Sequence, residues 1–184
     1  MDLMLLTIAH SLQSMGWATE LRESALVYPV VMMGHLAGMA LFGGMIVMTD
    51  MRILGLGLKK YPIADVVKGL RPWKHAGLTW TASCGIALAW SEADKYAGNP
   101  YFWMKMSFFG LILIHALVFR GSVYSKVEEF DRTAVVPGRA KLAAILSLVL
   151  WTGVVSSGRW IGYYEPKDKD RVSEVVSLQF LHTK

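Results

Sequence analysis

The stretch that decides the fold runs from Ala25 to Thr49 and reads ALVYPVVMMGHLAGMALFGGMIVMT. It contains no Asp, Glu, Lys or Arg, so a helix built from it is apolar on every side rather than along one stripe. A helix needs about 20 residues to cross the hydrocarbon core of a bilayer, which is about 30 Å thick. The stretch therefore predicts a membrane-spanning helix, with bounds near residues 25–50.

Three further apolar stretches follow and predict spans near residues 72–92, 100–120 and 140–162. None of them alternates apolar and polar residues, which argues against strands. Of the 184 residues, 54% are hydrophobic and 18% are charged, whereas about a quarter of the residues in a soluble domain are charged. We therefore predict an all-α integral membrane four-helix bundle that forms one domain over residues 1–164.

The two ends of the chain are more polar than the predicted spans. The N-terminus has Asp2 where a signal peptide needs basic residues. Leu5, Ile8 and Leu12 share one side of a helix, which predicts a short N-terminal interfacial helix. The segment 165–184 alternates in charge and is too polar to fold alone. We expect it to be a periplasmic tail that a partner subunit holds.

Lysine and arginine are concentrated in two of the connections between predicted spans. The N-terminal segment has only Arg22, and the second and third spans are joined by a segment with only Lys95. The basic residues of the other two connections are Arg52, Lys59, Lys60, Lys68, Arg71 and Lys74, then Arg120, Lys126, Arg132, Arg139 and Lys141. Basic loops stay in the cytoplasm, so both termini are predicted to be periplasmic and the chain to be a multi-pass protein of the bacterial inner membrane. The net charge of +5 then reflects topology, and no nucleic-acid partner is expected.

Histidines in the predicted spans point to a cofactor. His35, His75 and His115 lie in or at the edge of three different spans, where ionisable residues are costly and often mark function. Membrane b-type cytochromes hold haem between imidazoles from separate helices. A rise of about 1.5 Å per residue puts His75 and His115 at nearly one depth, with His35 nearer the midplane or the periplasmic half. We predict haem b, ligated by His115 and His75 or by His35 with one of them; the alternative is hydrogen bonding between helices.

Other side chains in the spans have a functional and a structural interpretation. Lys105 and Arg159, near predicted periplasmic ends, could contact a haem propionate, a quinone or a lipid headgroup, or could anchor the helix ends and form surface ion pairs. The 11 methionines could bind copper(I) together with histidine, although adaptable apolar packing accounts for them. Gly34 and Gly38 form a G-x-x-x-G, which allows close approach of another helix or a flat ring.

The first predicted span also carries a recognisable pattern. Ser24, Tyr28-Pro29, His35, Gly38 and the run Asp50-x-Arg52-x-Leu54-Gly55 occur in order, followed by RPW at 71–73, NPYFWMK at 99–105 and SSGRWIGYY at 156–164. With this pattern the chain, over about residues 20–164, resembles an uncharacterised bacterial four-helix membrane family. The resemblance implies the architecture. The family pattern lacks His75 and His115, so the resemblance does not imply haem.

Two functions remain open from the sequence. The first is a small, b-type-cytochrome-like electron-transfer subunit of an oxidoreductase complex. The second is a cofactor-free accessory subunit that packs against catalytic membrane partners. No C-x-x-C-H is present, which excludes covalent c-type haem, and no hydrolase or nucleotide-binding motif is present. We therefore expect no enzyme activity from the chain by itself, with the lipid bilayer and other membrane subunits as partners.

Overall fold

The computed structural model describes residues 3–164; the tail expected at 165–184 lies outside the described residues. The described residues form helices joined by short turns and loops, and they include no strand. The elements are α1 (Leu3–Gln13), α2 (Gly16–Glu23), α3 (Val27–Ile53), α4 (Ile63–Ser91), α5 (Ala93–Ala97), α6 (Pro100–Phe119), the π-helix η1 (Arg120–Tyr124), α7 (Val127–Thr133) and α8 (Gly138–Ile161). The all-α prediction is confirmed.

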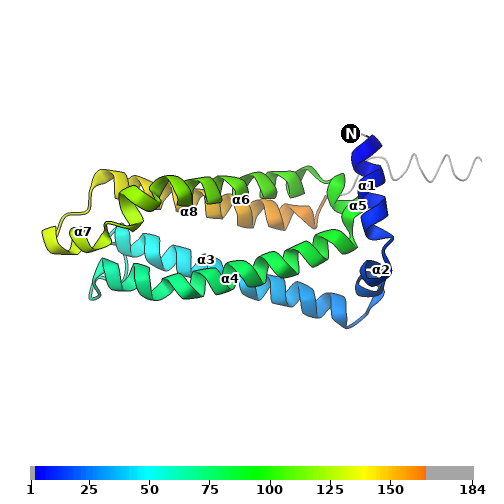
Figure 1. Ribbon diagram of the computed structural model, residues 1–184, viewed down its shortest axis with the longest axis horizontal. Coiled ribbons are helices and arrows are strands. Elements are labelled where there is room, and N and C mark those ends of the chain that lie inside the picture. The colour runs from blue at the N-terminus through cyan, green and yellow to red at the C-terminus, as the bar shows by residue number, and fades with distance from the viewer. Residues whose placement is uncertain (1–2, 165–184) are drawn as a thin grey trace, which may run out of the picture.

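Four long helices, α3, α4, α6 and α8, run side by side along the molecule (Figure 1). Helix α3 packs on α4 and on α8, and α6 packs on α8. Helices α1 and α2 lie across one end, where α1 contacts α5, and α7 lies at the opposite end. We call these the α1 end and the α7 end.

Three helical stretches are long and apolar enough to cross a membrane: Val27–Ile53, Pro100–Thr133 and Gly138–Ile161. Their outward-facing side chains are apolar; Leu36, Leu117 and Val149, for example, are all more than half exposed. A soluble helix would place polar residues at such positions. The chain is therefore a membrane protein with three candidate spans, and α4 is not among them.

Helix α4 begins earlier than the sequence predicts, at Ile63 instead of near residue 72. The carboxylate of Asp131, on α7, accepts hydrogen bonds from the backbone N–H groups of Ile63 and Ala64, both at 2.8 Å. These bonds satisfy two donors that a helix start leaves without partners. Pro72, at the predicted start of the second span, lies inside α4.

The start of α6 agrees with the sequence analysis. Pro100 occupies the first turn, and the Asn99 side chain accepts a hydrogen bond from the Tyr101 N–H at 3.0 Å. Proline is well tolerated there because its missing N–H would have no partner within the helix.

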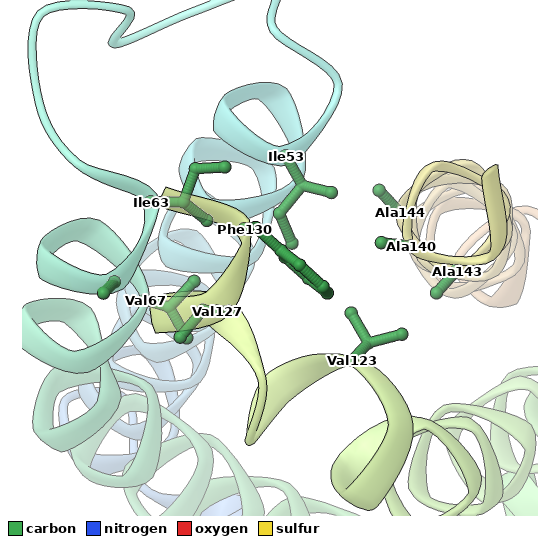
Figure 2. Close-up of a cluster of buried hydrophobic side chains, with 10 residues drawn as sticks. Ile53, Ile63, Val67, Val123, Val127, Phe130, Ala140, Ala143 and Ala144 are labelled. Carbon is green, nitrogen blue, oxygen red and sulfur yellow. The ribbon is translucent and has the colours of Figure 1, made fainter. Parts of the chain in front are cut away.

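Two buried apolar clusters hold the long helices together. One lies at the α7 end and joins α3, α4, η1, α7 and α8; Figure 2 shows nine of its members labelled, namely Ile53, Ile63, Val67, Val123, Val127, Phe130, Ala140, Ala143 and Ala144. The other lies midway along α3 and α8 and comprises Phe42, Ile46, Trp151 and Val154. Within this second cluster, which we call the central apolar layer, the rings of Phe42 and Trp151 meet edge to face with centroids 5.5 Å apart. Edge-to-face contacts are a favourable arrangement of aromatic rings.

Helices α3 and α4 approach each other closely at Gly38. A Cβ atom at this position would lie 2.6 Å from Thr81 Oγ1 and 3.0 Å from the Thr81 backbone nitrogen. Only glycine fits so close to a neighbouring backbone. The prediction that another helix approaches the G-x-x-x-G is therefore confirmed.

Candidate functional site

His35 faces α4 from α3, and its ring is oriented by a backbone bond. Its Nδ1 lies 3.0 Å from the carbonyl oxygen of Thr81. A carbonyl oxygen can only accept, so Nδ1 donates and the neutral ring keeps its lone pair on Nε2. The Thr81 hydroxyl donates in turn to the His35 carbonyl at 3.3 Å. The ring is thus held in one tautomer and one direction.

Lys105, on α6, reaches the free nitrogen of His35. Its Nζ lies 3.4 Å from His35 Nε2 and 3.9 Å from Met39 Sδ. Lys105 and His35 are both half-buried. In residues 3–164 no carboxylate forms an ion pair with Lys105. An ammonium group in an apolar span therefore has only an imidazole lone pair and a thioether as acceptors, which leaves donor capacity unused.

The surroundings of His35 leave little room for it to turn. A Cβ atom at Gly85 would lie 2.9 Å from His35 Cε1, so the ring packs directly on the α4 backbone at that glycine. Beside it, Trp80 Nε1 donates to the carbonyl oxygen of Gly34 at 2.9 Å, while more than half of the Trp80 side chain is exposed. We call His35, Lys105, Thr81 and Met39 the His35 centre.

The other two histidines of the long helices have different surroundings from His35 and from each other. His75 is exposed on α4. His115 is buried, with Nε2 2.9 Å from the Ala143 carbonyl oxygen on α8 and its ring 4.8 Å from that of Phe119. That carbonyl accepts the Nε2 hydrogen, so Nε2 has no lone pair to offer a metal. Haem ligation by His75 and His115 stays a prediction.

Arg159 does not join Lys105. Its side chain is exposed, and its guanidinium donates to the hydroxyl of Tyr163 and lies 4.9 Å from the centre of that ring. Lys105 and Arg159, which the sequence analysis considered together, therefore face different surroundings.

The acidic residues of the α1 end pair with other groups. Glu92 accepts from the Tyr28 hydroxyl at 2.9 Å and from Lys95 at 3.1 Å. Burial, with the nearby Glu92 charge, raises the pKa of Tyr96 to about 12, because both disfavour the phenolate. Asp94 lies 3.1 Å from His10. These contacts tie α1, α3 and α5 together at the α1 end.

One buried carboxyl lies near the end of the first long helix. Asp50 belongs to the last turn of α3 and is only 1% exposed. Its Oδ2 has no hydrogen-bond partner in the described structure. The sequence signal was present, since an acidic residue within four positions of Ile46 on an apolar helix can lie on the same side as the core. In residues 3–164 no three His, Cys, Asp or Glu side chains gather around one point.

The chain matches the model of one protein family over residues 25–164, a range that includes all four long helices. The chain belongs to a family of unknown function, DUF6644. This confirms the resemblance to an uncharacterised family. No curated protein and no solved structure matches the sequence.

Proposed function

We propose that the chain is a small four-span subunit of a bacterial inner-membrane complex, and that its His35 centre binds the oxygen-rich headgroup of a lipid-soluble molecule such as a quinone. The observation that carries this proposal is the contact between Lys105 Nζ and His35 Nε2. An ionisable group inside a span is costly to keep, so it is a functional candidate with its partner named.

The chemistry of the centre suits an acceptor ligand. Lys105 donates at most one of its three hydrogens to His35, and a ligand carbonyl oxygen would use another. Hydrogen bonds that involve a charged donor contribute about 1.5–3 kcal/mol each. Lys105 lies five residues after Pro100, or about 7 Å along α6, and His35 lies about 12 Å along α3. A headgroup at this depth would keep its hydrocarbon tail in the bilayer.

The proposal is tested by binding in nanodiscs with a decyl-tailed benzoquinone as the probe. We expect saturable binding, read from quenching of tryptophan fluorescence because Trp80 adjoins the centre. Lys105→Met keeps the length of the side chain and removes the donor, so we expect binding to weaken about tenfold or more, which corresponds to about 1.4 kcal/mol. His35→Leu is expected to act in the same direction.

The matched control is Lys95→Met, since Lys95 is an exposed lysine paired with Glu92 at the surface. We expect it to bind the probe as the unaltered protein does. Equal binding by all variants would mean that the probe only partitions into lipid, and the proposal would be rejected. Competition by anionic lipid alone would instead identify a phospholipid headgroup as the ligand.

Haem b on His35 is the second candidate, favoured by one specific observation. Ligating histidines commonly donate their other ring N–H to a carbonyl, as His35 does to Thr81. The haem would supply one-electron transfer, and Lys105 would have to leave Nε2. A reduced-minus-oxidised spectrum of the purified protein tests this candidate. The b-type band is expected to vanish in His35→Leu and to persist in His115→Leu; absence of the band in the unaltered protein rejects it.

A further inference from the structure

Asp50 is a buried carboxyl that the proposed function does not use. It lies one turn before the end of α3, is 1% exposed, and leaves Oδ2 without a hydrogen-bond partner in the described structure. A carboxylate removed from water needs a cation or several donors, and one that lacks them is strongly disfavoured. An ionised Asp50 would therefore need a compensating cation close to it.

The cation that interacts with Asp50 is Lys74, but its hydrogen bond goes to another residue. Lys74, on α4, interacts electrostatically with Asp50, yet its Nζ donates to the Thr49 hydroxyl at 3.0 Å. Among the described residues Asp50 forms no ion pair. A Lys74 ammonium facing an ionised Asp50 would be expected to pair with it directly, because a paired charge is far less costly than an unpaired one. The observed arrangement is the one expected for a neutral Asp50.

The remaining neighbours of Asp50 come from each element packed around it. On α8, the Ser147 hydroxyl forms a hydrogen bond with the carboxyl. On η1, Tyr124 is close enough to interact electrostatically with it. On α4, Arg71 lies beside Lys74. On α3 itself, Arg52 donates to the Tyr61 carbonyl at 2.7 Å and not to Asp50. Two hydroxyls, from Ser147 and Tyr124, and the Lys74 cation thus lie around the carboxyl.

A second, independent feature marks the same end of the molecule. Residues Arg120–Tyr124 form a π-helix, a rare conformation that is frequently found at functional sites. Within it, Ser122 Oγ is also buried without a hydrogen-bond partner in the described structure. Unpartnered buried polar atoms are few in native structures and call for an explanation.

We propose that Asp50 is a proton-binding site that exchanges its proton with the water at the α7 end, with Lys74 as its switchable partner. In the loaded state Asp50 is a neutral acid and Lys74 donates to Thr49. On unloading, the O–H bond of the acid breaks, the proton passes to water at the α7 end, and the electron pair stays on the carboxylate. The Lys74 ammonium then moves from Thr49 to Asp50 and forms the ion pair.

The experiment is infrared difference spectroscopy of the full-length protein in nanodiscs, titrated from neutral to alkaline pH. We expect a carboxylic-acid C=O band that is present at neutral pH and lost at alkaline pH. The band is expected to be absent in Asp50→Asn and unchanged in Asp131→Asn, since Asp131 is a carboxylate held by two backbone N–H groups. In Lys74→Met the midpoint of the titration is expected to rise by about one pH unit or more, because the carboxylate loses its cation.

Each outcome bears on the proposal. A spectrum without this band at neutral pH, or a band that survives in Asp50→Asn, overturns the proton site. An unmoved midpoint in Lys74→Met overturns the assignment of Lys74. If Asp50→Asn does not fold, the proposal is still tested by two measurements: the presence of the band in the unaltered protein and the shift of the titration midpoint in Lys74→Met. Failure of quinone binding at the His35 centre leaves these measurements unaffected, so the two proposals are separable.

Discussion

At the scale of single residues, the three intramembrane histidines differ in which ring nitrogen is engaged. His35 uses Nδ1 toward Thr81 and leaves Nε2 for Lys105. His115 uses Nε2 toward Ala143, on the helix against which it packs. His75 is exposed. The same side chain thus provides an oriented acceptor in one helix and a bond between helices in another. Only His35 can take a ligand on Nε2 without breaking its hydrogen bond to a backbone carbonyl.

Replacing His115 should affect stability and not ligand binding. His115→Leu removes the hydrogen bond to Ala143 and puts an apolar side chain of similar size in place of the imidazole. The free energy of unfolding is expected to fall by about 0.5–1.5 kcal/mol. Unfolding by SDS in mixed micelles measures this change. Probe binding at the His35 centre should stay as in the unaltered protein, and a loss there would assign His115 a direct role.

At the scale of elements, α4 depends on a side chain from a distant part of the chain. Asp131 lies on α7, yet it holds the first two N–H groups of α4. The charged first part of α4 would be a poor helix start without such a cap, because the cap satisfies donors and its negative charge suits the helix N-terminus. Helices α4 and α7 are therefore coupled at the α7 end.

Asp131→Asn tests this coupling. The amide keeps one acceptor oxygen and turns an N–H₂ group toward the second donor, so we expect a loss of about 1 kcal/mol of stability. Hydrogen exchange at Ile63 and Ala64 should become faster before the rest of α4 is affected. Glu128→Gln serves as the control, since the Lys68–Glu128 pair lies on the exposed surface and should contribute little. Equal effects of both changes would contradict a specific cap.

At the scale of the whole molecule, the number of spans decides on which side the loops lie. Helix α4 is as long as its neighbours, but its first part carries charges, including Lys68 and Arg71, that lower its mean hydropathy. The proposal of four spans rests on its later residues, 72–91, which pack along α3. Four spans put the α3–α4 connection on the opposite side from the α1 end.

Labelling of single cysteines distinguishes three spans from four. In a Cys84→Ser background, Lys60→Cys and Lys95→Cys place thiols at exposed positions before and after α4. With a membrane-impermeant maleimide on intact cells, we expect Lys95→Cys to react and Lys60→Cys to react only after permeabilisation. Reaction of both from the same side would show that α4 does not cross.

Much of the fold follows from the sequence because the bilayer constrains it. Runs of about 20 uncharged residues predict spanning helices, because a helix satisfies its own backbone groups in lipid. The G-x-x-x-G predicts the close approach of a second helix. The site was less predictable. Lys105 and His35 are 70 residues apart, and depth along each helix does not reveal which side faces which neighbour. For the same reason the matched depth of His75 and His115 did not reveal that His75 is exposed and His115 is buried.

The central apolar layer has a consequence for how the protein would respond to membrane voltage. Phe42, Ile46, Trp151 and Val154 lie between the His35 centre and Asp50 and form a slab of low dielectric. An electric field applied across a bilayer drops mainly over its least polarisable part. Moving one charge across the full potential involves about 2.3 kcal/mol per 100 mV. A proton that reaches Asp50 from the α7 end stays on one side of this layer and crosses little of that drop. The proton occupancy of Asp50 is therefore expected to follow the pH at the α7 end and to respond little to membrane voltage.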